Sequence, residues 1–325
     1  MRIGKIKENA LKRSVLKQIK TEFGKESSAA VGADCAFSNE KKAFSATATV
    51  SARIDDSGFY AVIKAVNSIR AQGLLPDHVT VNILLPEDTE EPALKKIVAD
   101  AIEGCRATGT VYAGGHTEVT RAVNRPVITA VCVGCPQEDA PLYADKKAKA
   151  GQELVVTRWI ALEGTAMLAA TGFDELTKKY PVPFVRDSVD FKEYLVIGPE
   201  MDILAKHSVG AVHDISSGGV FAALWEMAEA AGLGLRADLK SIPIRQETVE
   251  ICEFYETNPY LLTSAGALLI ATDEGEALCE ALLQAGINAR IIGRLSEGND
   301  RIIVNGDEER FLDMPQSDEI LKILG

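Results

Sequence analysis

The residues with the clearest chemical potential stand at 213–219, in the stretch HDISSGG, directly before the apolar-faced segment VFAALWEMAEAAG. An imidazole, a carboxylate, two hydroxyls and two glycines meet there: His213, Asp214, Ser216, Ser217, Gly218 and Gly219. Serine caps helices and glycine allows tight turns, while free N–H groups at a helix start attract anions. We therefore expect the serines to cap a helix at this junction, with a phosphate or metal site beside it.

Three further stretches carry side chains that suit metal or phosphate binding. In residues 113–120, AGGHTEVT, a glycine pair frees the backbone next to an imidazole and a carboxylate, although a tight turn with a surface histidine explains the same letters. Residues 31–37 place one carboxylate near an expected strand start, and residues 162–165, LEGT, open an expected helix whose N-cap is the plainer interpretation. The candidates are Asp34, Gly114, Gly115, His116, Thr117, Glu163, Gly164 and Thr165.

The length, composition and net charge of the chain limit the functions that these residues could serve. The chain has 325 residues, which suits two domains, with 46% hydrophobic and 25% charged residues as in ordinary globular proteins. Its formal charge of −12 argues against nucleic-acid binding, because an acidic surface repels phosphate backbones. No apolar run approaches the roughly 20 residues that cross a bilayer, and no apolar segment of a secretory signal follows the N-terminus. We expect no membrane contact and a cytoplasmic location.

Six scattered cysteines do not form the pattern of a disulfide framework. Cys132 and Cys135 form a C-x-x-C pair, but no second pair stands at a spacing that would complete a zinc site. The pair precedes Pro136 and a loop rather than a helix, which disfavours a thioredoxin-like motif. We interpret both cysteines as small apolar residues near the end of a strand, and any further role stays open.

Hydrophobic periodicity predicts the elements that would position these residues. In the first half it predicts a helix at 4–22 with a basic, solvated face, strands at 43–53, 78–86 and 125–134, helices at 57–73 and 90–109, and a short strand at 110–120 that breaks into a glycine turn. This order indicates an α+β layer with helices on one face of a largely antiparallel sheet. The polar stretch 135–152 suits a connection between domains.

The second half repeats a rough strand–helix–strand order. It predicts strands at 153–159, 266–272, 288–295 and 301–304, and helices within 160–172, 174–209, 247–254, 275–286 and 317–324. Prolines break the helical pattern between 174 and 209.

Five stretches occur in a recognisable order along the chain: GADCA, AGGHTEVT, LEGT, HDISSGGVFAALWEMAEAAGLGL and NPYLLTSAGALLIAT. Together they resemble the aminoimidazole-ribonucleotide synthetase (PurM-like) superfamily, and within it the branch related to the hydrogenase maturation factor HypE. The resemblance covers about residues 1–310 and is most specific at the HDISSGG motif.

The resemblance implies a two-domain PurM-like fold of the α+β or α/β class. The N-terminal domain, 1–136, would pair with that of a second chain so that their strands form a dimeric β-barrel, beside a C-terminal α/β domain at 150–310 and a tail at 311–325. It also implies that ATP and Mg²⁺ bind in a cleft between the domains. There an amide or carbonyl oxygen would be activated by phosphorylation, or a small-molecule or protein substrate would be phosphorylated outright.

Carried over residue by residue, the resemblance implies catalytic roles for Asp34, His116 and Asp214, with the two carboxylates holding the metal. The implied ATP- and phosphate-binding residues are Asn67, Gly114, Gly115, Thr117, Glu163, Gly164, Thr165, Ser216, Ser217, Gly218 and Gly219. Three carboxylates of the family are absent, and Ala33, Ala48 and Ser68 stand in their places. Because Mg²⁺ prefers hard oxygen ligands, these losses predict a weakened Mg·ATP site.

Three functions stay open at this point. The first is an ATP-dependent, synthetase- or kinase-like enzyme with a reduced metal site. The second is a catalytically inactive homodimeric scaffold that works through a partner, such as one in metalloenzyme maturation. The third is a small-molecule-binding protein unrelated to ATP. Since the chain ends DEILKILG, without the cysteine tail on which HypE carries its transferred group, we expect it not to be that carrier.

Overall fold

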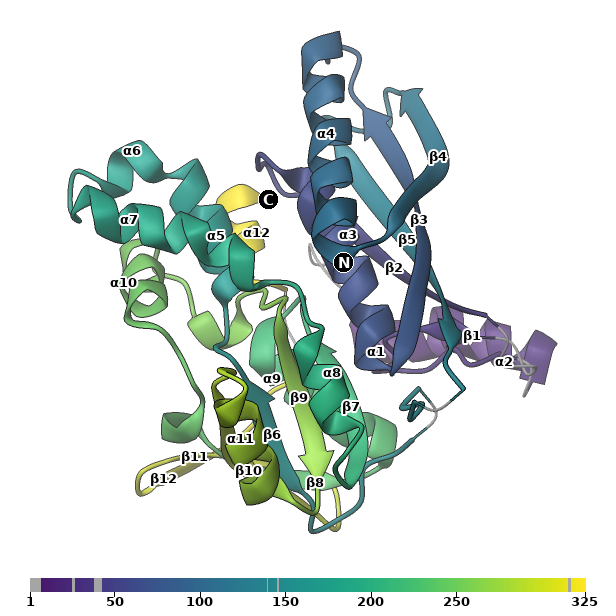
Figure 1. Cartoon of the computed structure of the whole chain (residues 1–325), viewed down its shortest axis with the longest axis vertical. Helices are drawn as coiled ribbons and strands as arrows, with labels where there is room; N and C mark the ends of the chain where they lie inside the picture. Colours follow the sequence, from purple (N-terminus) through teal and green to yellow (C-terminus); the bar gives the residue numbers. More distant parts are fainter. Residues whose placement is uncertain (1–6, 25–26, 38–42, 139, 145, 315–316) are drawn as a thin grey trace.

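The computed structural model describes residues 7–24, 27–37, 43–138, 140–144, 146–314 and 317–325. Its strands form two sheets, one in each half of the chain (Figure 1). The first sheet has the order β1-β2-β5-β3-β4, and its neighbours are antiparallel except for β3 and β4. Its strands are β1 (Ala36–Phe37), β2 (Phe44–Val50), β3 (Leu74–Leu85), β4 (Val111–Val119) and β5 (Val127–Pro136).

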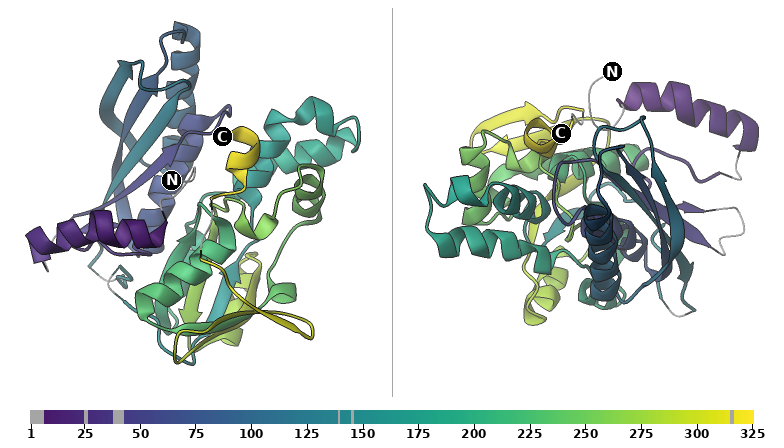
Figure 2. Two further views of the ribbon diagram at one scale, coloured as in Figure 1. Left: turned by 180° about the vertical axis from the view of Figure 1, so that it is seen from behind. Right: turned by 90° about the horizontal axis from the view of Figure 1, so that it is seen from above.

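Two helices, α3 (Ser57–Ala71) and α4 (Glu91–Thr108), lie on the same side of this sheet (Figures 1 and 2). The alternating pattern of β3 points Val81 and Ile83 into the core beneath α3, and burying each such side chain stabilises the fold by about 1.5–3 kcal/mol. A Cβ on Gly58 would lie 2.3 Å from the carbonyl oxygen of Ile97. The missing side chain therefore lets α3 and α4 pack closely.

Strand β4 contradicts the glycine turn expected within 110–120. Its pairing with β3 continues through Gly114 and Gly115 as far as Val119. A Cβ on Gly115 would lie 1.9 Å from the carbonyl oxygen of Val81, so a side chain there would prevent the two backbones from approaching. The glycine pair serves strand pairing rather than a turn.

The second sheet has the order β12-β11-β8-β10-β6-β9-β7. Its strands are β6 (Glu153–Thr157), β7 (Val209–Ile215), β8 (Gly234–Asp238), β9 (Ala267–Thr272), β10 (Ala289–Ser296), β11 (Arg301–Asn305) and β12 (Glu308–Phe311). The helices of this half are α5 (Leu162–Thr171), α6 (Phe173–Leu176), α7 (Val182–Val189), α8 (Pro199–Leu204), α9 (Gly219–Ala231), α10 (Gln246–Phe254), α11 (Gly275–Gln284) and α12 (Ile320–Leu324). Short 3₁₀ turns cover 190–194, 239–241 and 259–261.

The two halves share a buried boundary formed largely by α3. One apolar cluster runs from Tyr60 and Val66 of α3 to Leu162 and Met167 of α5. At the other end of the helix, Arg70 donates to the carbonyl of Ile197 at 2.7 Å, which ties α3 to the second half of the chain. Functional side chains placed at this boundary are consequently held by both halves.

The expected N-terminal helix is present from Glu8 to Phe23, as α1 (Glu8–Leu11), a π-helical turn (Lys12–Leu16) and α2 (Lys17–Phe23). The start of the expected range, 4–6, lies outside the described residues. Its apolar spacing predicts an inner face of Leu11, Val15, Leu16 and Ile19; Leu16 is buried and Leu11 and Ile19 are partly buried, whereas Val15 is 39% exposed. Polar contacts also attach the helix, and Trp225 donates to Glu8 at 2.7 Å.

Within the described ranges, no helix is long and apolar enough to span a membrane. All six cysteines are free thiols. Cys132 is buried in β5 whereas Cys135 is exposed near its end. These positions fit the interpretation of the pair as residues of a strand.

Candidate functional site

A cavity of 430 Å³ lies between the two halves of the chain. We call it the cleft. It is lined by Leu11, Ala30, Val31, Gly32, Ala33, Asp34, Thr47, Ala48, Thr49, Lys64, Ser68, His213, Asp214, Ser216, Ser217, Gly219, Ala223 and Glu226. Five of the predicted site residues therefore meet here from two separate segments: Asp34, Asp214, Ser216, Ser217 and Gly219. The three positions expected to have lost carboxylates, Ala33, Ala48 and Ser68, line the same cavity.

Asp34 is held by three donors on its two oxygens. Its Oδ1 lies 2.7 Å from Nδ1 of His213. Its Oδ2 accepts from Nε2 of Gln72 at 2.7 Å and from the backbone N–H of Asp214 at 3.2 Å. These donors take three of the roughly four lone-pair sites of the carboxylate, which leaves little of Asp34 for a cation.

His213 lies at the end of β7 between two carboxylates. Its Nδ1 faces Asp34, and its Nε2 lies 3.1 Å from Oε2 of Glu226 on α9. Burial opposes a charge on the imidazole, but the two carboxylates outweigh it and raise the pKa of His213 to about 10. The ring is therefore an imidazolium at neutral pH, and with both nitrogens protonated it is neither a metal ligand nor a general base.

Asp214 is the carboxylate with an oxygen left over. Its Oδ2 accepts from the hydroxyl of Ser68 at 3.1 Å, whereas its buried Oδ1 has no hydrogen-bond partner among the described residues. Burial, together with the nearby charge of Asp34, raises the pKa of Asp214 to about 7. This group can therefore gain or lose a proton near neutral pH at a point where it borders the cleft.

Lys64 brings a buried cation from α3 to the cleft wall. Its Nζ lies 3.0 Å from Oε1 of Glu163 and donates to Ser217 at 3.1 Å and to Thr263 at 2.9 Å. Two of its three N–H donors make hydrogen bonds to these hydroxyls, whereas Glu163 is held by charge, because its Oε1 accepts no hydrogen bond from the described residues. Sequence reasoning missed Lys64, although a lysine inside the apolar run AVIKAVNS was a usable signal.

Glu163, predicted as a phosphate-side residue, is the anion of this buried pair. It is fully buried, and its Oε2 accepts from the hydroxyl of Thr263 at 2.5 Å and from the backbone N–H of Ala265 at 3.0 Å. Its neighbours on α5 are buried as well: Gly164 donates its N–H to the carbonyl of Thr263, and Thr165 donates to that of Ala161. These three residues support the cleft wall from behind rather than line the cavity.

The expected serine cap at the start of α9 is wrong. The N-cap residue is Gly218, which has no side chain, and neither Ser216 nor Ser217 caps the helix. Instead Asp318, from the segment before α12, accepts from the N–H of Gly218 at 2.8 Å and from that of Thr263 at 3.1 Å. A carboxylate therefore already occupies part of the anion-attracting helix start, which the sequence alone did not predict.

The remaining predicted residues lie away from the cleft. Asn67 is buried, donates to the carbonyl of Leu195 at 2.6 Å and accepts from the N–H of Ile197 at 3.2 Å. The residues Gly114, Gly115, His116 and Thr117 lie on β4, at the edge of the first sheet. His116 is largely exposed and its Nε2 lies 3.2 Å from Oε2 of Glu118. Within this chain, β4 contributes nothing to the lining of the cavity.

The donor set does not fit a magnesium ion of the kind the resemblance implies. Among the described residues, no group of three or more His, Cys, Asp or Glu side chains could hold a metal. Both oxygens of Asp34 already accept from donors, Ala33 and Ala48 offer no side-chain oxygen, and Asp214 has one carboxylate oxygen without a partner among the described residues. Because Mg²⁺ demands near-octahedral oxygen ligation, the cleft is poorly suited to it.

Comparison with known proteins agrees with this architecture. Residues 15–135 match AIR synthase related protein, N-terminal domain, and residues 149–305 match AIR synthase related protein, C-terminal domain. A carbamoyl dehydratase HypE of Rhodobacter capsulatus is 28% identical over 247 residues, which cover 74% of this chain and 69% of the relative.

Solved structures give the same result. The fold resembles that in a HypE–HypF complex, with a TM-score of 0.71 and 21% identity over 93% of this chain and 100% of the other. It also resembles a HypE solved in complex with ATP, with a TM-score of 0.66 and 18% identity over 86% of each chain. The expected two-domain PurM-like fold is thereby confirmed. Matched in both of its halves, the chain belongs to the AIR synthase related family and is similar to HypE within it.

Proposed function

We propose that the chain is a HypE-like protein that binds a nucleotide in the cleft, with a weakened metal site and impaired phosphoryl transfer. The observation that carries the proposal is the composition of the cleft wall, where Ala33, Ala48 and Ser68 stand beside Asp34 and Asp214. A relative of the same fold binds ATP, which supports nucleotide binding as the retained part of the activity.

The proposed contacts use groups that border the cavity. The hydroxyls of Ser216 and Ser217 and the backbone of Gly219 would meet the phosphates, with the charge of Lys64 close behind them. Asp214 would contribute as a protonated carboxyl group, because its pKa of about 7 allows Oδ1 to donate to a phosphate oxygen. These are weaker anchors than a set of metal-bound carboxylates.

Calorimetry with ATP, with and without Mg²⁺, tests the proposal. We expect the Kd to change by less than about threefold, or about 0.6 kcal/mol, when Mg²⁺ is added, because few oxygens are available to hold the ion. The variant with Ala33→Asp, Ala48→Asp and Ser68→Asp should restore metal dependence and switch on ATP hydrolysis. Its control carries asparagine at the same positions, which adds similar volume without charge. Tight, strongly Mg²⁺-dependent binding by the natural chain would overturn the proposal.

A second candidate function is that of an inactive scaffold. The observation in its favour is that charged side chains that line the cleft already have partners: His213 lies against Asp34, and Lys64 lies against Glu163 behind the cleft wall. The HypE–HypF complex supports a metalloenzyme-maturation partner for such a scaffold. No heat of binding with millimolar ATP, at any magnesium concentration, would favour this function over the first.

We further propose that the chain is a homodimer in the cytoplasm. Strand β4 supports the dimer, since it is a sheet edge on which Val111 and Val119 are 63% and 59% exposed. Six unpaired cysteines support a reducing compartment. Sedimentation equilibrium tests the dimer: Val111→Asp with Val119→Asp should give monomers, and a monomeric natural chain would refute it.

A further inference from the structure

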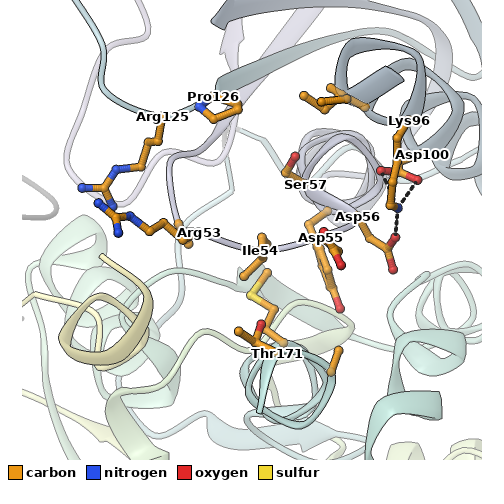
Figure 3. A pocket seen from close by; sticks show the side chains of 16 residues that line it. Arg53, Ile54, Asp55, Asp56, Ser57, Lys96, Asp100, Arg125, Pro126 and Thr171 are labelled. Carbon is orange, nitrogen blue, oxygen red and sulfur yellow. Dashed lines mark hydrogen bonds and ion pairs between the residues drawn. The ribbon is translucent and has the colours of Figure 1, made fainter. Parts of the chain in front are cut away.

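A second cavity of 430 Å³ lies at the opposite end of α3 and shares no lining residue with the cleft. Its walls come from the segment after β2, from α4, from the end of the loop before β5 and from α5 (Figure 3). Apolar side chains form much of its surface, including Ile54, Tyr60, Ile97 and Met167. We call it the arginine pocket after Arg53 and Arg125, which also line it.

The two arginines of the arginine pocket lie apart from its acidic residues. In Figure 3 the side chains of Arg53 and Arg125 both extend toward one side of the pocket. Neither has a carboxylate partner among the described residues, and Arg125 donates only to the side chain of Asn124 at 3.2 Å. Two neighbouring guanidinium groups without a carboxylate partner leave N–H donors available to an anion that binds between them.

The acidic side of the pocket is mostly neutralised. Lys96 lies 2.9 Å from Asp56 and 3.1 Å from Asp100, and Lys192 lies 3.2 Å from Asp56. Asp55 is the exception, because it is exposed and has no ion-pair partner in the described ranges. In Figure 3, Ile54 lies between Arg53 and Asp55.

The lining therefore presents two unpaired cations and one unpaired anion across an apolar surface. Arg53, Arg125 and Lys96 balance Asp55, Asp56 and Asp100, so the lining is neutral as a whole although it is strongly polarised. A polarised but neutral pocket favours a ligand that is itself neutral and polarised. A doubly charged anion would leave Asp55 facing a like charge.

We propose that the arginine pocket binds a small zwitterion, with a carboxylate at one end, an amine at the other and an apolar chain between them. The carboxylate binds Arg53 and Arg125, because the guanidinium fork matches its two oxygens. The amine binds Asp55, and the apolar chain covers Ile54 and Met167. Since the pocket and the cleft share no residues, this site is independent of the proposed nucleotide binding.

The experiment uses the full chain labelled with ¹³C at its methionine methyl groups and titrates it with 6-aminohexanoate. Of the five methionines, Met167 lines the arginine pocket, whereas Met227 lines a cavity that shares Asp34 and His213 with the cleft. The variant Met167→Leu assigns the reporting signal. Saturable shifts of the Met167 methyl without shifts of Met227 place the ligand in the arginine pocket.

Matched ligands and variants test the chemistry. Hexanoate and hexylamine each lack one charged end and should bind about fivefold to tenfold more weakly, as should 6-aminohexanoate to Arg53→Gln, Arg125→Gln or Asp55→Asn. The controls Arg121→Gln and Asp88→Asn make the same changes at exposed positions outside the pocket and should leave the Kd unchanged.

Two results would overturn the inference. One is the absence of a saturable Met167 shift with 4-aminobutanoate, 6-aminohexanoate and 8-aminooctanoate, which together cover the span between the charged ends. The other is binding that hexanoate matches, or that the controls weaken as much as the pocket variants do. Neither result depends on whether ATP binds in the cleft.

Discussion

Replacing Lys64 by methionine removes the only cation that meets Glu163 in the described contacts while keeping an apolar chain of similar length. The two charged atoms lie 3.0 Å apart, and the side chains of Lys64 and Glu163 are only 10% and 0% exposed. Removing one partner of such a pair leaves an uncompensated buried charge, which costs about 3–5 kcal/mol. Glu163 keeps its bonds from Thr263 and Ala265, so we expect the lower part of that range.

Urea denaturation and thermal unfolding measure the effect. We expect the midpoint temperature of Lys64→Met to fall by roughly 4–5 °C, because an unfolding entropy of about 2.1 cal/mol/K per residue gives about 1.5 °C per kcal/mol for a chain of 325 residues. The double variant Lys64→Met with Glu163→Gln replaces the ion pair by neutral groups of similar shape. It should recover at least about half of the loss, because no buried charge is then left unpaired.

The exposed pair of Lys95 and Glu91 provides the control. Their charged atoms lie 2.8 Å apart, but both side chains are 75% exposed, so Lys95→Met should cost less than about 0.5 kcal/mol. If Lys64→Met costs no more than this control, or if the double variant is no more stable than the single one, the assignment of Lys64 and Glu163 as a mutually dependent buried pair is refuted.

Three further outcomes follow from the cleft. ATP binding should tighten as pH falls from 8 to 6, because Asp214, with its pKa raised to about 7, becomes protonated and ceases to repel phosphate. Calorimetry on the variant Asp214→Asn should show no such pH dependence of the Kd. The pKa of His213 is raised from 6.5 to about 10, so the contribution of its charge to stability is complete below about pH 6.5 and is lost as pH rises through 10. Urea titrations of His213→Gln across this range should therefore lack the decline in unfolding free energy that the natural chain shows. Asp318→Asn should lower the free energy of unfolding by about 1–2 kcal/mol, because it weakens the hydrogen bonds from the N–H groups of Gly218 and Thr263. Ser216→Ala should cost less than about 0.5 kcal/mol in the same urea assay, since Ser216 does not cap the helix.

Elements with a strong period were predictable from the letters. The alternation in HVTVNILLP gave β3, and the apolar spacing of 57–73 gave α3, because each pattern repeats with the geometry of its element. The strand β12 was not predicted, because EERF carries no apolar alternation. The glycine turn in β4 was wrong for a local reason: Gly114 and Gly115 fit a turn equally well until the backbone of β3 lies against them.

The domain limits at 136 and 150 and the shared dimeric barrel stay predictions, as do the roles of the individual site residues. For the site, the sequence indicated which residue types are available. It indicated that Asp34, Asp214 and the serines belong together and that Ala33, Ala48 and Ser68 lack carboxylates. This information is chemical, and it is present in the chain before any folding.

Order along the chain therefore determined the family and the main helices and strands, whereas the weakened metal site stays a proposal. Tertiary structure alone decided which charges meet. Asp34 is paired with His213 from a position 179 residues away, Lys64 with Glu163, and the start of α9 with Asp318. The physical reason is that helix and strand periods arise from neighbours a few residues apart, whereas the ionisation and pairing of a buried group depend on distant segments that only packing brings within about 3 Å.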